Sequence, residues 1–263
     1  MQTFQKISQR LTDPVFYRKR IRQVLRCCRR ATAVPRFRSI EEVGEIHHAT
    51  VAVAHPDDET FCSGLICALV EKGTKVSLLC LTRGEGGPTG EWTRDELGKA
   101  REAEMRSACE ALGIEDLMFL DHVDPVAREH RVFAPDVSPN ELAKQIAPLL
   151  EESDLVISEG SSGEYWHPAH LLVYEAVAKV VEEQRWITFL AANENHPIPK
   201  LVNEDDPTDL ELDVSVHRSR REKALLCHRS QVSLFARFAE GTLADFIEKT
   251  STESYCLKGP GTG

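Results

Sequence analysis

The sequence lacks any long hydrophobic segment. No stretch approaches the roughly 18 or more consecutive apolar residues of a membrane-spanning helix, and the first thirty residues lack the apolar run of a signal peptide. We therefore expect the chain to remain in the cytoplasm. The sequence also lacks an internal repeat, and its 263 residues are enough for one sizeable core, so we expect one main folded domain.

Cysteine pairs of the CxxC type are absent too. Eight cysteines are present, at positions 27, 28, 62, 67, 80, 109, 227 and 256, and several stand within apolar runs. Free cysteine is among the most buried residue types, and disulfides are rare in cytosolic proteins. The sequence therefore predicts reduced, buried thiols rather than a disulfide framework.

Acidic residues are almost missing from residues 1–38, which carry eleven Lys and Arg but only one acid, Asp13. This segment is +10, and since the whole chain is −10, residues 39–263 carry −20. An acidic body argues against a nucleic-acid partner. The basic segment either docks on the acidic body or reaches an anionic membrane surface, for which residues 15–30 offer an amphipathic helix. Both interpretations stay open.

From residue 47 onward, short apolar runs alternate with helical patterns, as in the βαβ units of parallel sheets. The predicted strands are 48–54, 75–81, 116–120, 154–158 and 187–191, and the predicted helices are 60–72, 94–112, 138–151, 168–184 and 217–229. This pattern predicts an α/β fold with a doubly wound, mostly parallel, Rossmann-like sheet. We divide the chain into a basic N-terminal arm (1–46), one main domain (47–257) and a short tail (258–263).

In such sheets the ligand site lies outside the carboxyl ends of the strands, so the loops that follow the predicted strands should share one rim. Three of these loops stand out by composition: 82–93, 159–167 and 193–210. Loops of this length beside a site are often binding loops or lids. The first lacks the spacing of a phosphate-binding loop, and we interpret it as a substrate-facing rim with Arg83 as a binding candidate.

The segment His55-Pro56-Asp57-Asp58-Glu59 follows a hydrophobic strand and opens a helix. An imidazole and a carboxylate three residues apart across such a turn can converge on one ion, and His and Asp are ordinary zinc ligands. Alternatively, Asp58 is simply a helix N-cap. A cap explains one acid, whereas this segment holds three acids and a histidine, so we favour a metal site.

A second polar segment, YWHPAH at residues 165–170, follows the predicted strand 154–158. Two histidines three residues apart are weak evidence alone, because a lone histidine is more often an ordinary surface or core residue. Two polar segments at strand ends of one sheet are stronger evidence, since a catalytic zinc site takes three protein ligands and keeps one open position.

These segments resemble those of a known family, the LmbE-like or PIG-L-like zinc-dependent N-deacetylases, which act on N-acetylglucosaminyl conjugates. AHPDDE (54–59) resembles its first motif and HPAH (167–170) its HPDH motif; REAEMRSACEALG (101–113), FLDHVD (119–124) and KALLCHRSQ (223–231) are also similar. The resemblance covers about residues 47–256. It implies a hydrolase of the predicted fold that removes an N-acetyl group with a bound zinc, or iron(II) in its place, and releases acetate.

By matching position, the resemblance implies that His55, Asp58 and His170 bind the metal and that Asp57 is the general base. It further implies that His167 is either the acid or the group that stabilises the oxyanion. These five residues form the implied centre of the site.

The resemblance implies that Tyr165 polarises the amide carbonyl, and that Arg101 and Asp124 hold sugar hydroxyls. Alternatively, Arg101 is a helix-surface arginine and Asp124 an ordinary turn residue. His228 either lies behind the site or is a helix-surface histidine.

One position departs from the family pattern: residue 169 is alanine, where the family has an aspartate behind the catalytic histidine. Because an adjacent negative charge favours the imidazolium, His167 should be less basic without it. Two alternatives to N-deacetylation stay open: an amidase of a larger sugar or thiol conjugate, and a non-catalytic carbohydrate-binding protein, which Ala169 favours. We expect a small amino-sugar conjugate as ligand; a homo-oligomer stays open.

Overall fold

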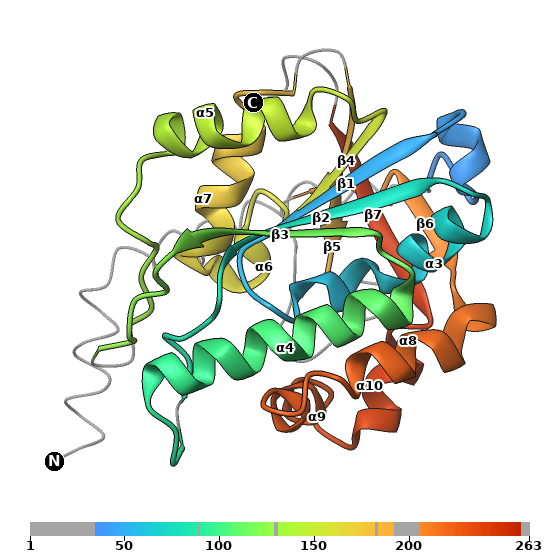
Figure 1. The fold of residues 1–263 in the computed structure, drawn as a ribbon. Coiled ribbons are helices and arrows are strands. Elements are labelled where there is room, and N and C mark those ends of the chain that lie inside the picture. Colours follow the sequence, from blue (N-terminus) through green and yellow to red (C-terminus); the bar gives the residue numbers. More distant parts are fainter. Residues whose placement is uncertain (1–34, 89, 129–130, 182–183, 192–205, 259–263) are drawn as a thin grey trace, which may run out of the picture. The chain divides into compact units, whose positions relative to one another are not determined.

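A seven-stranded sheet runs through the computed structural model of the protein, in the order β3-β2-β1-β4-β5-β7-β6 (Figure 1). Five strands are parallel: β1 (His48–Val53), β2 (Lys75–Thr82), β3 (Asp116–His122), β4 (Leu155–Ser158) and β5 (Arg185–Leu190). The other two, β6 (Leu210–Asp213) and β7 (Thr252–Lys258), pair antiparallel at one edge. The predicted doubly wound, mostly parallel α/β fold is confirmed.

The structure describes residues 35–88, 90–128, 131–181, 184–191 and 206–258, which belong to one compact unit. Most of the predicted basic arm, most of the 193–210 loop and residues 259–263 lie outside the described residues. Phe37 pairs with the backbone at Leu210, and Lys258, predicted as the first tail residue, is the last residue of β7. Across the described ranges, no helix is both long and apolar enough to span a bilayer.

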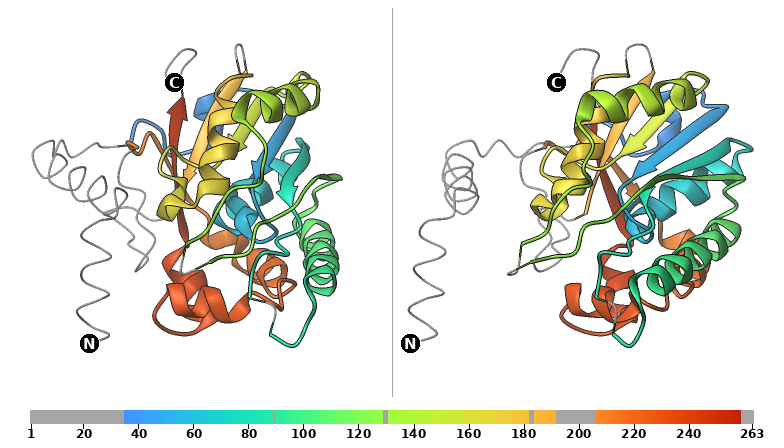
Figure 2. Two further views of the ribbon diagram at one scale, coloured as in Figure 1. Left: turned by 90° about the vertical axis from the view of Figure 1, so that its left-hand side faces the viewer. Right: turned by 60° about the vertical axis from the view of Figure 1, so that its left-hand side comes forward.

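Helices cover both faces of the sheet (Figures 1 and 2). One face packs against α3 (Ser63–Glu71), α4 (Arg94–Leu112), α8 (Arg218–Leu225), α9 (Val232–Phe238) and α10 (Leu243–Lys249). The other packs against α5 (Pro139–Leu150) and α7 (Pro168–Val177). The described part also contains the one-turn elements η1 (Ile40–Val43), η2 (Asp58–Cys62), α6 (Gly163–Trp166) and η3 (Ser215–His217).

Alternating side chains divide the core between these two faces. Along β1, Val51 and Val53 point into the larger apolar cluster with α3 and α4, whereas Ala52 points into the smaller cluster with α5 and α7, as does Ala54 just beyond the strand. All four are buried, as expected for a parallel strand that is covered on both faces. This explains why the sequence shows continuous apolar runs at these strands rather than alternation.

Helix α4 confirms a predicted helix, and its sequence explains both ends. Thr93 and Glu96 form a capping box at its start, and Gly113, with φ 77°, follows its last residue. The predicted helix 168–184 is shorter than expected. It ends at Val177, after which the amides of Lys179 and Val180 bond three residues back, a tightening common at helix ends.

Strands β6 and β7 and helices α9 and α10 were not predicted. β6 has only four residues, and β7 contains Glu253 and Ser254, which are polar yet buried. Neither strand therefore stands out as an apolar run. Their positions depend on pairing between distant parts of the chain, such as Phe189 of β5 with Tyr255 of β7.

The cysteines of the described part agree with the predicted reduced thiols. All six are free, five of them are buried, and Cys227 is half-buried. Burial raises the pKa of Cys67 and Cys256 to about 12, so these thiols stay protonated and act as small apolar side chains. Cys27 and Cys28 lie outside the described residues.

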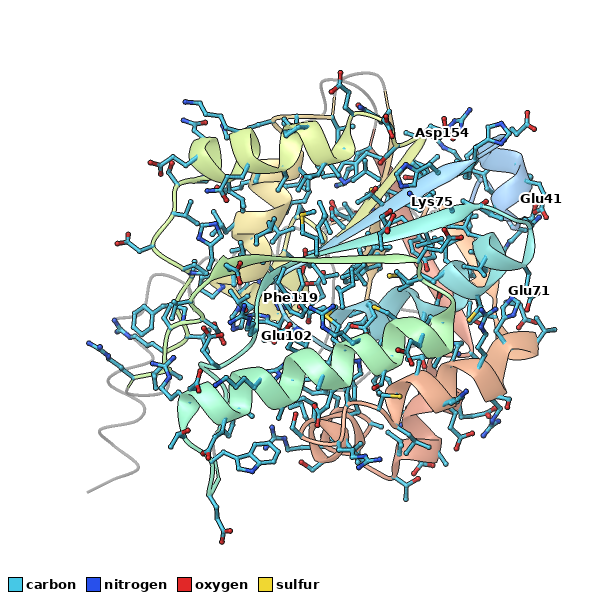
Figure 3. The ribbon with its side chains drawn as sticks, in the orientation of Figure 1. Glu41, Glu71, Lys75, Glu102, Phe119 and Asp154 are labelled. Atoms are coloured by element: carbon cyan, nitrogen blue, oxygen red, sulfur yellow. The ribbon has the colours of Figure 1, made fainter. Side chains whose placement is uncertain are left out.

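Polar side chains at the amino ends of the strands join neighbouring strands. Figure 3 labels Lys75, the first residue of β2, which pairs with Asp116 of β3 (2.7 Å). It also labels Asp154, whose carboxylate accepts the backbone N–H groups of His47 and His48 (2.7 and 3.0 Å). The two polar segments singled out in the sequence lie at the other ends of the strands.

Strand β7 also carries a buried acid that joins three elements. The Glu253 carboxylate accepts hydrogen bonds from the backbone N–H groups of Gly64 and Leu65 (2.7 and 2.9 Å) and from the Tyr255 hydroxyl (2.6 Å). Arg221 of α8 lies 3.6 Å from the same carboxylate, and both side chains are buried. Glu253 therefore satisfies two first-turn amides of α3, the helix that follows the candidate site loop.

Replacing Glu253 by alanine should lower the free energy of unfolding by about 3–5 kcal/mol, because it leaves the Arg221 guanidinium buried without its partner. Tyr255→Phe removes only one hydrogen bond to the same carboxylate and should cost about 1 kcal/mol. Urea unfolding followed by circular dichroism measures both. Equal stability of the two variants would contradict the central role given to this carboxylate.

Candidate metal centre

The two polar segments singled out in the sequence meet at the carboxyl ends of β1 and β4. These strands are neighbours, with Ala52 beside Ser158. The chain runs outward from β1 through β2 to β3 on one side and continues with β4 on the other, and ligand sites of open α/β sheets lie at such a point. His55 follows β1, and His170 lies in the first turn of α7, after β4.

Three polar atoms from these segments converge. The Nδ1 atom of His55 lies 3.2 Å from Nε2 of His170 and 3.4 Å from Oδ2 of Asp58, and the last two atoms are 3.5 Å apart. Two ligands of a tetrahedral zinc, each about 2.0–2.1 Å from the ion, lie about 3.3–3.4 Å from each other. The three side chains are buried. Their spacing and donor atoms therefore fit one divalent cation.

The far nitrogen of each of these histidines faces a carboxylate. Nδ1 of His170 lies 2.6 Å from Oε2 of Glu164, and Nε2 of His55 lies 3.5 Å from Oδ1 of Asp124. A carboxylate in this position holds the ring proton on the far nitrogen, which leaves the near nitrogen free to bind a metal. Both rings are thus oriented in the way that metal-binding histidines require.

Two further side chains lie close enough to compete as ligands. His167 can join His55 and His170, and Glu159 can join Asp58 and His170, with ligand atoms within 4.8 Å of one another. One atom of each candidate has another partner: Nδ1 of His167 accepts from the backbone N–H of Ala169 (3.3 Å), and Oε1 of Glu159 accepts from Ala54 (2.6 Å). Oε2 of Glu159 is buried without a hydrogen-bond partner among the described residues. We favour His55, Asp58 and His170, whose ligand atoms lie within 3.5 Å of one another.

Asp57 is buried beside this cluster with a backbone conformation unusual for a non-glycine residue, φ 109°. Burial raises the pKa of its carboxyl group to about 6, and the Arg101 guanidinium, 3.4 Å away, opposes this rise. A carboxylate with a pKa near neutrality is suited to accept a proton.

Arg101 itself is buried and extends from α4 toward the two site loops. Its Nη1 donates to the carbonyl of Gly84 (3.0 Å) and its Nη2 to the carbonyl of Pro56 (2.6 Å). The helix-surface alternative for Arg101 is therefore wrong. These two hydrogen bonds of Arg101 connect the loop after β2 to the loop that carries His55 and Asp57.

Tyr165 and His167 lie beside the histidines of the cluster, on a strained segment. Glu164 and Trp166 have φ values of 57° and 67°, which is rare for non-glycine residues. This backbone turns the partly exposed Tyr165 ring toward the histidines, with its centroid 5.7 Å from that of His167. Burial lowers the pKa of His167 to about 2, so its ring is neutral.

The residues expected to hold substrate are not all at the cluster. Asp124 is buried, faces His55 and accepts from the backbone N–H of Gly86 (3.1 Å). Arg83 instead lies at the surface, where it pairs with Asp121 (2.6 Å) and with Glu102 of α4 (2.9 Å). The structure therefore brings Asp124 to the site and leaves Arg83 on its outer rim.

Ala169, the departure from the family pattern, points away from the cluster. Its methyl group is buried among apolar residues of α5, α7 and β4 such as Leu142, Leu172 and Val156. Its backbone N–H, rather than a carboxylate, is the partner of Nδ1 of His167. A neutral His167 ring held in this way carries its proton on Nε2.

Three buried acids beside the cluster were given no role from the sequence: Glu59, Glu159 and Glu164. Glu59 belongs to the first polar segment, so the sequence singled it out but did not indicate its role. Glu159 and Glu164 occur in a loop that stood out only by its length and composition. Their burial depends on how that loop folds over β4, and no local pattern signals it.

The fold and the cluster together define a class: α/β proteins with a His-Asp-His cluster at the topological switch point of the sheet. The family model described as "PIG-L: GlcNAc-PI de-N-acetylase" matches residues 50–181, half of the chain, including both polar segments. The chain belongs to this family. The predicted LmbE-like and PIG-L-like resemblance is confirmed.

A curated relative is similar over most of the chain. It is named "Probable N-acetyl-alpha-D-glucosaminyl L-malate deacetylase 2", from Bacillus anthracis, and is 32% identical over 228 residues. The match covers 80% of this chain and 94% of the relative.

Two solved structures share the fold. N,N'-diacetylchitobiose deacetylase from Pyrococcus horikoshii matches with a TM-score of 0.57 at 17% identity, over 82% of this chain and 85% of that one. The 4-carboxy-2-hydroxymuconate hydratase from Pseudomonas putida KT2440 also matches with a TM-score of 0.57, at 20% identity, over 82% and 98%. Because these two proteins are named for different reactions, the fold alone does not define the chemistry.

We expect Glu164→Gln to weaken zinc binding by about 10–100-fold, because the variant loses the carboxylate that contacts Nδ1 of His170. An amide that donates to Nδ1 of His170 leaves the ring proton on Nε2, the atom that faces Asp58. Competition with a chelator measures the affinity. Glu175→Gln, an exposed substitution on α7, the helix that carries His170, is the control. Equal zinc affinity in the two variants would show that Glu164 does not support metal binding.

Proposed function

We propose that the protein is a metal-dependent hydrolase that removes the N-acetyl group from an N-acetylglucosamine-type conjugate. The observation that carries this proposal is the buried triangle of His55, Asp58 and His170, with each histidine backed by a carboxylate. Asp57, beside this triangle, supplies a base that is not one of the three ligand candidates. Family membership supports the same reaction.

A divalent cation held by His55, Asp58 and His170 would supply Lewis acidity and would lower the pKa of water. Zinc fits the donor set, and iron(II) is the alternative. Asp57 takes the proton of the attacking water and then gives it to the leaving amine nitrogen as the C–N bond breaks. Its Oδ1 lies 3.4 Å from Arg101, which keeps the carboxylate oriented while it holds that proton.

His167 and Tyr165 act on the acyl oxygen. Because Nδ1 of His167 accepts from Ala169, the Nε2–H group is the donor available for the oxyanion. We therefore assign His167 the role of oxyanion stabiliser rather than acid. Tyr165, whose ring centroid lies 5.4 Å from that of His170, is a second donor, and removing one such donor typically costs about a hundredfold in rate.

The shared part of two names supports the proposed substrate class. The family is described by an N-acetylglucosaminyl phosphatidylinositol activity, and the Bacillus anthracis relative by an N-acetylglucosaminyl malate activity. The common group is N-acetylglucosamine, whereas the aglycones differ. We propose that this chain releases acetate from such a conjugate, with Asp124 at the sugar side of the site.

Asp57→Asn and Asp58→Asn should separate the roles of the two adjacent carboxylates. Asp57→Asn should keep the metal and lose at least about a hundredfold in kcat, because it removes a base. Asp58→Asn should lose metal affinity, because it removes a charged ligand. Elemental analysis and steady-state kinetics measure the two effects. Equal metal loss in both variants would show that these roles are assigned wrongly.

A panel of N-acetylglucosamine conjugates tests the reaction itself. Zinc-loaded protein should release acetate and the free amine from at least one conjugate, detected by mass spectrometry. Zinc-loaded Asp57→Asn protein is the control for release that does not depend on the site. Release of a larger acid instead would identify an amidase, and tight binding without any release would identify a carbohydrate-binding protein.

A further inference from the structure

Asp57 is held in its unusual conformation by a contact to its backbone. With φ 109°, its N–H group does not follow the regular path of the helix that begins at Asp58. This N–H donates to Oε2 of Glu59 at 3.0 Å, in the buried interior. Since the Asp57 side chain leaves the backbone at this residue, its direction depends on that conformation.

The other oxygen of Glu59 has its own partner. Oε1 of Glu59 lies 2.5 Å from Nε2 of His228, and both residues are at most 1% exposed. His228 comes from the segment after α8, far away in the sequence, and is not a helix-surface residue. The pair therefore extends from the backbone of Asp57 to the C-terminal third of the chain.

The segment that carries His228 is itself fixed to the helix that holds the Asp57 carboxylate. Two residues beyond His228, Ser230 donates to Glu104 of α4 through both its N–H (2.9 Å) and its hydroxyl (2.6 Å). Arg101, one turn earlier on α4, lies 3.4 Å from Oδ1 of Asp57. Helix α4 thus supports Asp57 twice: directly at the carboxylate, and indirectly at the backbone.

We infer that Glu59 and His228 form a positioning pair for Asp57, fixing its backbone so that its carboxylate stays aimed at the site. The inference deepens the proposed function, since it gives a task to two buried residues that neither bind the metal nor touch substrate. Loss of the pair lets the Asp57 backbone relax toward a more common conformation. The carboxylate then turns away from the water it serves, while the metal ligands keep their places.

Two polar substitutions at one position test this. The side-chain amide of glutamine reaches about as far as Nε2 of histidine, whereas that of asparagine reaches only as far as Nδ1. His228→Gln should therefore keep the contact to Glu59, and His228→Asn should lose it. We expect His228→Gln to keep kcat within about threefold of the original protein and His228→Asn to lose tenfold or more, with similar KM and zinc content in both.

Amide hydrogen exchange of zinc-loaded protein provides a readout that does not depend on turnover. The Asp57 N–H should exchange at least tenfold faster in His228→Asn than in His228→Gln, because its acceptor is no longer held. His217→Gln is the matched control: His217 is another buried histidine close to α8, and it pairs with Glu71 through Nδ1 (3.3 Å), which the glutamine amide does not match. This control should change neither kcat nor exchange at Asp57.

The two readouts separate failure of this inference from failure of the proposed function. If the original protein hydrolyses no conjugate, the proposed reaction is wrong, and the exchange comparison alone decides the positioning role. Equal exchange at Asp57 in His228→Asn and His228→Gln overturns the inference. So does an equal kcat for these two variants when the original protein is active.

Discussion

The burial of six carboxyl groups at one edge of the sheet is the constraint around which the site is arranged. They belong to Asp57, Asp58, Glu59, Asp124, Glu159 and Glu164, and each residue is at most 6% exposed. A buried carboxylate needs a donor, a positive partner or a proton, and here histidine rings, Arg101 and backbone N–H groups serve. A cation at the His-Asp-His cluster would offset further charge, which links metal binding to stability.

The cost of burying a carboxylate without a partner also explains why position 169 is occupied by alanine rather than by an acid. Its side chain faces an apolar cluster, so an acid there would have to leave that cluster or be buried without a partner. The chain instead presents the Glu164 carboxylate to His170, from a residue whose own backbone is strained. A carboxyl group behind the cluster is therefore present, but it contacts His170 and leaves His167 with a neutral backbone partner.

Local signals in the sequence were sufficient for the parallel half of the fold and for the position of the site. Strands β1 to β5 are apolar runs, and the two polar segments follow two of them, so the switch-point rule placed His55 near His170. Strand β7 could not be predicted, because its buried polar residues acquire partners only through long-range pairing. The contacts of Glu164 and of His228 are likewise invisible in sequence, since each depends on how a loop or a distant segment packs.

Glu253, which accepts hydrogen bonds from the first turn of α3, affects the order in which the protein can fold. The amide of Gly64 and its partner Glu253 are 189 residues apart. As a ribosome makes the chain, the parallel strands and both polar segments emerge well before this acceptor does. Helix α3 and the loop before it therefore stay incomplete until β7 joins the sheet. Late closure of this kind slows folding and prolongs the exposure of strand edges to other chains.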